Sequence, residues 1–432
     1  MEKVMSRVEG KALPIVLFTI FVDVLGVGIL LPVLPQLIYT IFIPAGFSPD
    51  GALIMLGWLT AIFPLMMFFS TPILGQLSDR FGRKPVLALC LLGTAIGYVI
   101  FALGILLENI PLLFLGRALD GITGGNISVA RAIIADVSAP THRARNFGLM
   151  GAAFGIGFVA GPYIGARLAS PDAAFFGLFN TPHWFDHATP FWFAGILAVI
   201  NMTFVLMVLP ETHRHIARGL KVAWTKSLEN IKKAATRPAL RIIFTAEFLF
   251  WSGFTFFTTF FQILLIEKLG FKGSNVGDFF AYIGICIAVS QAVLLPILVK
   301  RFKSHNLLKV GMIGNGIALL LQLWPDKTSE LLLVAPLIAI FNGMIMANAS
   351  ALVSLSAGKA EQGEVLGIEA SVQSLAQAVP AIISGYVATM GVNMPVIVGG
   401  LTILAGGIIF IALYRPPKNV LAQETSMERA AS

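Results

Sequence analysis

The stretch that decides the fold is GQLSDRFGRKP, residues 75–85, which lies between two long apolar runs. Glycine adopts the backbone conformations that a tight reversal needs, so we expect Gly75 and Gly82 to turn the chain here. The carboxylate of Asp79 is of a type that an arginine or a helix N-terminus holds. Basic residues anchor such a turn at the inner surface of a membrane. They are Arg80, Arg83 and Lys84.

The composition around this stretch is that of a membrane protein. Of the 432 residues, 57% are hydrophobic and 12% are charged, whereas soluble domains carry about 25% charged residues. These values argue against a disordered chain, a nucleic-acid-binding domain, a disulfide-stapled secreted domain and an ordinary cytosolic enzyme. Cys90 and Cys286 both lie in apolar runs, so we expect core residues and no disulfide.

A helix that crosses a bilayer needs about 20 apolar residues, and the chain offers twelve such runs. The first is too long for a cleavable signal peptide and carries Asp23 near its middle. None of the six histidines falls within a run. The predicted spans are residues 12–38, 51–77, 86–107, 110–137, 146–169, 188–209, 239–266, 276–299, 307–325, 331–355, 364–388 and 394–414.

The basic residues orient these spans. With a cytoplasmic N-terminus, 24 of the 30 Lys and Arg residues fall on the inside and 3 on the outside. This bias is the positive-inside signal, and it places both termini in the cytoplasm and the loop 170–187 outside. It also explains the net charge of +8 without invoking nucleic acid.

One long polar stretch divides the spans into six plus six. We therefore expect an all-α membrane protein in which twelve transmembrane helices form two pseudo-symmetric six-helix bundles with a cavity between them. Residues 217–234 could form a basic amphipathic helix on the inner leaflet. The expected parts are an N-terminal bundle at 1–209, a cytoplasmic linker at 210–238, a C-terminal bundle at 239–414 and a cytoplasmic tail at 415–432.

Three segments carry a resemblance to a known family. The spacing within residues 75–85 resembles the signature loop of the major facilitator superfamily, and DVLGVGILLPVLP at residues 23–35 resembles the first-span motif of the 12-span drug:proton antiporters. A glycine-rich run in the fifth predicted span is similar to the antiporter motif of that family. Its residues are Gly151, Gly155, Gly157, Gly161, Pro162 and Gly165. Glycines four apart let another helix approach closely, and a proline permits a bend.

A fourth segment, LGRALDGITGG at residues 115–125, looks like the tetracycline-efflux branch of the family. The chain departs from that branch at several positions. A Gln is common where this sequence has Met67, a His where it has Ile287, and a small residue where it has Arg167, while Asp120 is an additional acid. These differences bear on tetracycline as the substrate more than on the transport mechanism.

Ionisable residues inside a membrane are costly, and they are functional by default. We expect proton coupling to involve Asp23, Arg117, Asp120 and Glu247. Asp23 and Arg117 are expected to face one cavity. Asp23 could carry the proton, contact the substrate or pair structurally with Arg117. Other polar residues could line the cavity, or could only join helices by hydrogen bonds. They are Asn126, Arg131, Gln262, Gln291, Asn342 and Glu369.

The resemblance implies proton-coupled export of a small lipophilic or amphipathic compound by alternating access from a bacterial inner membrane. The expected partners are this substrate, the proton and the bilayer, and we expect a monomer without cofactor or metal. No phosphate-binding loop, zinc motif or serine-hydrolase elbow occurs, which argues against a pump driven by ATP and against an enzyme. Two alternatives stay open: a facilitator or symporter importing a nutrient or metabolite, and a lipid translocase or non-transporting membrane interaction protein.

Overall fold

The computed structural model describes residues 2–138, 143–171, 173–175, 178–212, 223–356 and 362–416. The predicted tail beyond residue 416 and most of the first half of the linker, 213–222, lie outside these ranges. The chain divides into two compact units. Unit 1 comprises Met1–Ala52, Ile62–Lys226 and Lys272–Ala281, and unit 2 comprises Leu53–Ala61, Ser227–Phe271 and Tyr282–Ser432. The predicted domain boundaries stay a prediction.

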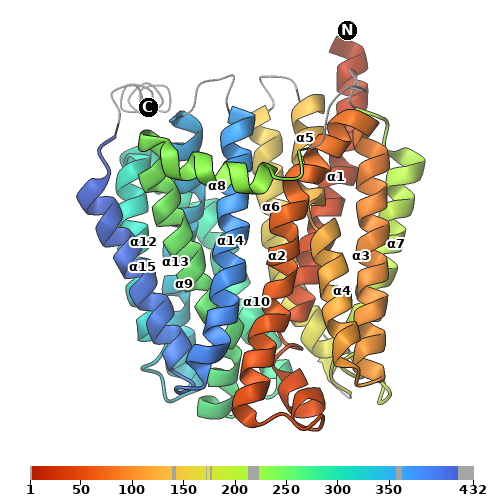
Figure 1. The fold of residues 1–432 in the computed structure, drawn as a ribbon, viewed down its shortest axis with the longest axis vertical. Coiled ribbons are helices and arrows are strands. Elements are labelled where there is room, and N and C mark those ends of the chain that lie inside the picture. Colours follow the sequence, from red (N-terminus) through yellow and green to blue (C-terminus); the bar gives the residue numbers. More distant parts are fainter. Residues whose placement is uncertain are drawn as a thin grey trace. The chain divides into compact units, whose positions relative to one another are not determined.

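Unit 1 is a bundle in which α1 packs on α6 and α7, and α3 packs on α4 and α7 (Figure 1). Its core lies where apolar faces of α1, α3, α5 and α7 meet, with fully buried side chains such as Val16, Leu87, Ile133 and Val205. Its helices are α1 (Glu2–Leu30), the π-helical segment Ile38–Phe42, α3 (Arg83–Leu106), α4 (Ile110–Thr123), α5 (Asn126–Val137), α6 (Arg143–Leu168) and α7 (Thr189–Val208). Helix α2 (Pro49–Phe81) and helix α10 (Gly273–Val289) contribute residues to both units.

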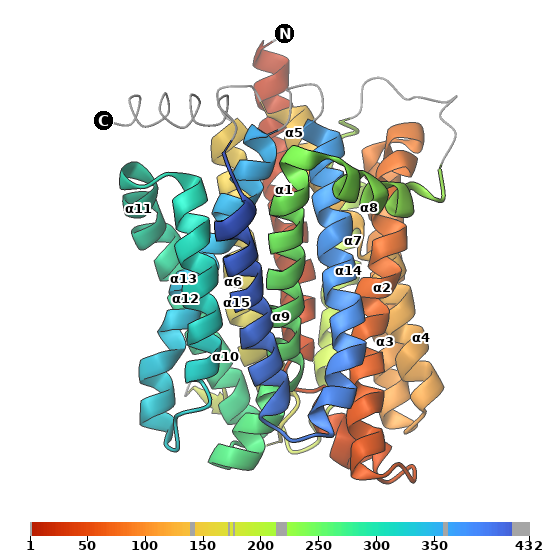
Figure 2. The ribbon, with the colours of Figure 1, turned by 60° about the vertical axis from the view of Figure 1, so that its left-hand side comes forward.

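Unit 2 is a second bundle, in which α9 packs on α14 and α15, and α12 packs on α13 and α15 (Figure 2). The amphipathic helix α8 runs crosswise to α14 (Figure 1) and is shorter than the predicted segment 217–234. The helices are α8 (Lys226–Thr236), α9 (Pro238–Leu269), the π-helical segment Ser290–Leu294, α11 (Leu295–Arg301), α12 (Ser304–Leu321), α13 (Thr328–Leu355), α14 (Gln362–Ala388) and α15 (Met394–Leu413).

The fold class is confirmed. Ten helices among the described residues are long and apolar enough to cross a membrane. The other two predicted spans are helical as well: 307–325 corresponds to the 18-residue α12, and 110–137 corresponds to α4 and α5. The fourth span is interrupted because Gly124 and Gly125 form a turn, which the sequence analysis read as continuous helix. The described residues also contain a small hairpin, β1 (Ala174–Phe175) and β2 (Phe179–Asn180), with Ala174 opposite Asn180.

Local signals set the ends of these helices. Ser48 caps α2 by accepting a hydrogen bond from the backbone N–H of Gly51, and Asn109 caps α4 by accepting from Leu112, at 3.1 Å each. Gly270 ends α9 in the left-handed conformation. The first span is irregular after Leu30, in a segment that contains Pro32 and Pro35, because proline has no N–H to continue the helical ladder.

Two predictions about single residues were wrong. Gly75 does not turn the chain: α2 continues to Phe81, and only Gly82 reverses it, with φ 101°. No residue between 75 and 81 breaks the helix, so the loop is shorter than predicted. His305 was expected in a loop but is the second residue of α12 and is buried, because α12 begins three residues before the predicted span. Cys90 and Cys286 are free, as predicted.

Candidate functional site

The interior of unit 1 holds a carboxylate on α1. The side-chain amide of Asn126 donates a hydrogen bond to Asp23 Oδ2 at 2.7 Å. Asn126 is the first residue of α5, directly after the turn at Gly124 and Gly125, and only 1% of it is exposed. Its Oδ1 has no hydrogen-bond partner among the described residues. Asp23 is therefore held by a neutral group that accommodates either the ionised or the protonated acid.

Arg117 has a partner of its own. Its Nη1 lies 3.0 Å from Asp120 Oδ2, one helical turn along α4, and both side chains are almost fully buried. The guanidinium also sits over the ring of Phe63, 4.5 Å from its centre. No described ion pair joins Arg117 to Asp23, so the structural-pair role considered for these two residues is not seen. Arg117 and Asp120 neutralise each other instead.

Tyr98 on α3 interacts electrostatically with the ionisable groups of both α1 and α4. Its side chain is buried and interacts with Asp23, Arg117 and Asp120. Its hydroxyl occupies the space that a side chain at Gly26 would fill, since a Cβ there would lie 2.0 Å from the Tyr98 oxygen. Tyr98 was not among the residues predicted from the sequence. Gly26 lies within the quoted first-span motif, but nothing in the sequence says which side chain fills the space beside it.

The reversal after α2 carries a network of charges. The guanidinium of Arg83 contacts Asp79 at 2.7 Å and Asp136 of α5 at 3.1 Å, and it donates to the Ser78 hydroxyl at 2.6 Å. Asp79 is thus held by an arginine, one of the two partners predicted for it. Arg80 instead lies over the ring of Phe81, at 5.1 Å.

Glu211 completes this network and was missed by the sequence analysis. Its carboxylate accepts hydrogen bonds from the backbone N–H groups of Arg83 and Lys84, at 3.0 and 3.2 Å. These are the first N–H groups of α3, so Glu211 caps that helix at the end where a negative charge is favourable. The only signal in the sequence is an acid two residues after a predicted span.

The glycine motif of α6 divides into two parts. A Cβ at Gly161 would lie 2.7 Å from Gly28 Cα, and one at Gly165 would lie 2.5 Å from the Ile29 carbonyl oxygen. Gly157 meets α1 in the same way, whereas a Cβ at Gly151 or Gly155 would touch nothing. Close helix approach therefore explains only three of the five glycines. Pro162 lies inside α6, and its ring contacts the same region of α1 at Gly28.

Beyond this motif, α6 carries Arg167, the residue that departs from the family pattern. Its guanidinium lies 2.7 Å from Asp278 on α10 and over the ring of Tyr163, at 5.0 Å. A Cβ at Gly277 would lie 2.2 Å from that of Ala166, so α6 and α10 are in direct contact here. Arg167 and Asp278 therefore form their ion pair one residue beyond the contact between Ala166 and Gly277.

In unit 2, Glu247 of α9 is 5% exposed and interacts with Glu369 of α14. Glu369 accepts a hydrogen bond from the Ser350 hydroxyl. Gln262 and Asn342 are buried, each with a side-chain oxygen that lacks a partner among the described residues. Gln291 is half-buried in a π-helical segment, and in unit 1 Arg131 is exposed on α5.

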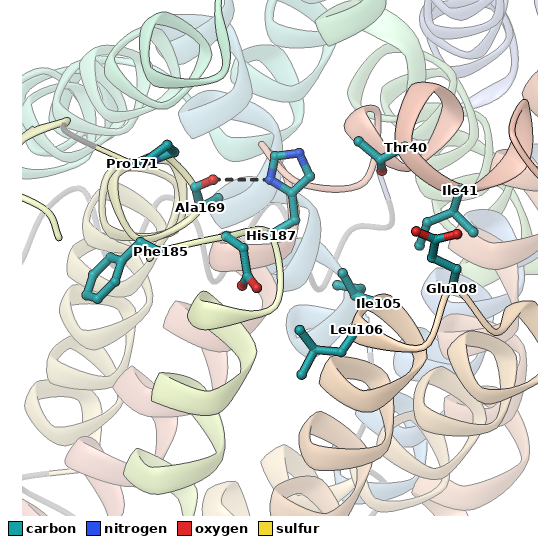
Figure 3. A pocket seen from close by; sticks show the side chains of 10 residues that line it. Thr40, Ile41, Ile105, Leu106, Glu108, Ala169, Pro171, Phe185 and His187 are labelled. Atoms are coloured by element: carbon teal, nitrogen blue, oxygen red, sulfur yellow. Dashed lines mark hydrogen bonds between the residues drawn. The ribbon is translucent and has the colours of Figure 1, made fainter. Parts of the chain in front are cut away.

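A separate hollow of about 420 Å³ lies at one end of unit 1 (Figure 3). Glu108 and Asp186 line it, and the His187 ring forms a hydrogen bond with the Ala169 carbonyl oxygen at 3.1 Å. None of the predicted site residues lines this hollow. In the described part of the chain, no three His, Cys, Asp or Glu side chains are placed to hold a metal ion.

A family model described as Major Facilitator Superfamily matches residues 16–338. The chain belongs to the Major Facilitator Superfamily. It is 30% identical over 367 residues to the class C tetracycline resistance protein of Escherichia coli, covering 85% of this chain and 87% of the relative. It is 25% identical to multidrug resistance protein 2 of Bacillus subtilis strain 168, covering 92% and 94%. The fold matches that of the xylose transporter XylE from E. coli with TM-score 0.73 at 16% identity, covering 95% and 99%.

Membership of the Major Facilitator Superfamily confirms the resemblance that the loop at 75–85 suggested. The chain is an integral, multi-pass membrane protein of a transporter family. Two groups of ionisable side chains link helices inside the two units. In unit 1 they are Asp23, Arg117 and Asp120, and in unit 2 they are Glu247 of α9 and Glu369 of α14.

Proposed function

We propose that this protein exports a small lipophilic or amphipathic compound in exchange for protons, by alternating access. The observation that carries the proposal is the half-buried Asp23 carboxyl group of α1, which has a neutral amide as its hydrogen-bond partner. Resemblance to proteins named for resistance to tetracycline and to several drugs supports export rather than import.

Asp23 is the proton carrier in this proposal. A proton from outside neutralises the carboxyl group, and the proton leaves on the inside when substrate is taken up. Desolvation disfavours the charged form of a carboxyl group, which suits reversible protonation. Arg117 and Asp120 stay charged because they form an ion pair with each other. The net charge of Asp23, Arg117 and Asp120 together therefore changes by one when Asp23 gains or loses its proton. Glu247 is a further candidate for coupling.

The protein acts in the bacterial inner membrane with both termini in the cytoplasm. The bias of basic residues supports this orientation. Its partners in the proposal are the transported compound, the proton and the surrounding lipid, and a single chain suffices without a cofactor. Import of a nutrient or reorientation of lipid lacks a supporting observation.

The test uses purified protein in proteoliposomes with a pH gradient, and tetracycline and a lipophilic cationic dye as probes. Asp23→Asn should stop transport driven by the gradient and leave exchange of probe at equal pH largely intact. Asp50→Asn, which changes an exposed acid at the start of α2, is the matched control and should transport normally. Retained pH-driven export in Asp23→Asn would remove Asp23 from the mechanism. Uptake of probe along the proton gradient would instead indicate a symporter.

A further inference from the structure

Unit 2 contains two carboxyl groups in mutual contact. Helices α9 and α14 pack side by side (Figure 2). Glu247 of α9 interacts with Glu369 of α14 through charge and through a side-chain hydrogen bond. Glu247 is 5% exposed, and its Oε2 finds no hydrogen-bond donor among the described residues if both acids are ionised. A proton on one of the two acids would supply the missing donor.

No described cation neutralises the negative charge of Glu247 and Glu369. Of the helices packed on α9, α15 carries no ionisable side chain, and α13 carries only Glu330 near its start. On α14 the other acid, Glu364, is paired with Lys233 and Arg237. On α9 itself the remaining charged residues lie toward its ends, and they are Arg241, Glu267 and Lys268. No described ion pair reaches Glu247 or Glu369.

A hydrogen bond from Ser350 to Glu369 indicates which of the two acids would carry a shared proton. The Ser350 hydroxyl of α13 donates to Glu369 Oε1 at 2.5 Å. Glu369 thus accepts one hydrogen bond as a carboxylate and can accept a second from a protonated Glu247. Glu247 is the more deeply buried of the two acids.

We propose that Glu247 and Glu369 share a single proton at neutral pH and form a second proton site, in unit 2, in addition to Asp23 in unit 1. Repulsion between two adjacent carboxylates, together with the burial of Glu247, disfavours ionisation of both acids. One bound proton leaves the pair with a single negative charge, which the Ser350 hydroxyl stabilises. If the pair separates during transport, both acids ionise and the proton is released to water.

This inference deepens the proposed function, on which it rests for its role in transport. Two proton sites set an upper limit of two protons per transport cycle, instead of the one that Asp23 alone allows. The protonation of the pair itself requires no gradient and no substrate. It can therefore be tested separately from proton-coupled export.

The test is infrared spectroscopy of the purified protein at neutral pH, which distinguishes the C=O stretch of a protonated carboxyl group from a carboxylate. Glu247→Gln and Glu369→Gln should each lose the same single C=O band. The introduced amide donates to the remaining carboxylate, so that no proton is needed. The double variant should match either single variant. Glu364→Gln is the matched control, because that acid is already ion-paired, and it should keep the band.

Ser350→Ala tests the pair without changing either acid. It should retain the band and shift its frequency, because Glu369 loses one donor and accepts more strongly from Glu247. A band that survives in Glu369→Gln would mean that Glu247 holds its proton by burial alone, and would overturn the shared site. A wild-type spectrum without a band that Glu247→Gln removes would overturn it as well. Neither result depends on whether Asp23→Asn abolishes export.

Discussion

The side-chain amide of Asn126 on α5 donates a hydrogen bond to Asp23 on α1 at 2.7 Å, while Arg117 on α4 forms an ion pair with Asp120. The acid proposed to carry the proton is therefore held by a group without charge. A cation in that place would keep the carboxylate ionised, whereas an amide lets it gain and lose a proton.

Replacing Asn126 by Ala should weaken pH-driven export more than exchange. A hydrogen bond to a charged group contributes about 1.5–3 kcal/mol, so the step in which Asp23 ionises should slow by roughly tenfold to a hundredfold. Export into a pH gradient and exchange at equal pH are compared in proteoliposomes. Ser128→Ala, on the same helix but bonded to the Gly125 carbonyl, should transport like the wild type. Equal losses in both assays would show that Asn126 only supports packing.

The Arg117 and Asp120 pair should behave as a unit in stability measurements. Removing one member of a buried ion pair leaves an uncompensated charge and costs about 3–5 kcal/mol. Arg117→Leu and Asp120→Leu should each lower the thermal stability of the purified protein. The double variant should recover much of the loss, because no buried charge remains. If the two single losses simply add in the double variant, the residues do not act as a pair.

Asp79→Asn should abolish transport while insertion and abundance stay near normal. The Asp79 carboxylate contacts Arg83 at 2.7 Å, and neutralising it removes the charge that holds this arginine beside α2. Transport per molecule is measured in vesicles with protein quantified by immunoblot. Wild-type turnover would mean that the loop serves only membrane insertion.

The glycines of α6 should differ sharply from one another. Gly161→Ala places a Cβ 2.7 Å from the backbone of Gly28, so α1 and α6 must separate. Because α1 carries Asp23, pH-driven export should fall strongly. Gly155→Ala is the matched control on the same helix, since its Cβ would touch nothing. Similar activity in the two variants would contradict the role of close packing.

The orientation is tested with a single cysteine at the exposed Asn180, in a chain in which Cys90 and Cys286 are replaced. An impermeant maleimide should label it in intact cells, because the basic residues predict that the 170–187 loop faces outside. Labelling only in inverted vesicles would reverse the orientation of the whole chain.

Hydropathy was sufficient to predict where the helices lie, because every span has to satisfy the same bilayer thickness. The α7 helix, Thr189–Val208, differs from its predicted span by one residue at each end. Partners within the site were harder to predict. Asp23 bonds to Asn126 and not to Arg117, and Asn126 follows the turn at Gly124 and Gly125 that interrupts a span predicted as one continuous helix.

Capping contacts between segments that are far apart in the sequence could not be predicted from it either. Glu211 lies 128 residues from Arg83, and its role at the start of α3 depends on how the end of α7 is placed. Gly75 shows the opposite error: a glycine in the right motif looked like a turn, but the helix around it continued. Composition identifies residues that can turn or cap, whereas tertiary packing decides which of them do.

The turn at Gly124 and Gly125 has a mechanical consequence. It places the Arg117 and Asp120 pair on α4 and the amide that holds Asp23 on α5, on opposite sides of this two-residue joint. A tilt of α5 about this joint would draw Asn126 away from Asp23 without disturbing the ion pair. Near its other end, α5 carries Asp136, which contacts Arg83 at the start of α3 at 3.1 Å. A shift of Arg83 that tilted α5 would then also change the hydrogen bond from Asn126 to Asp23.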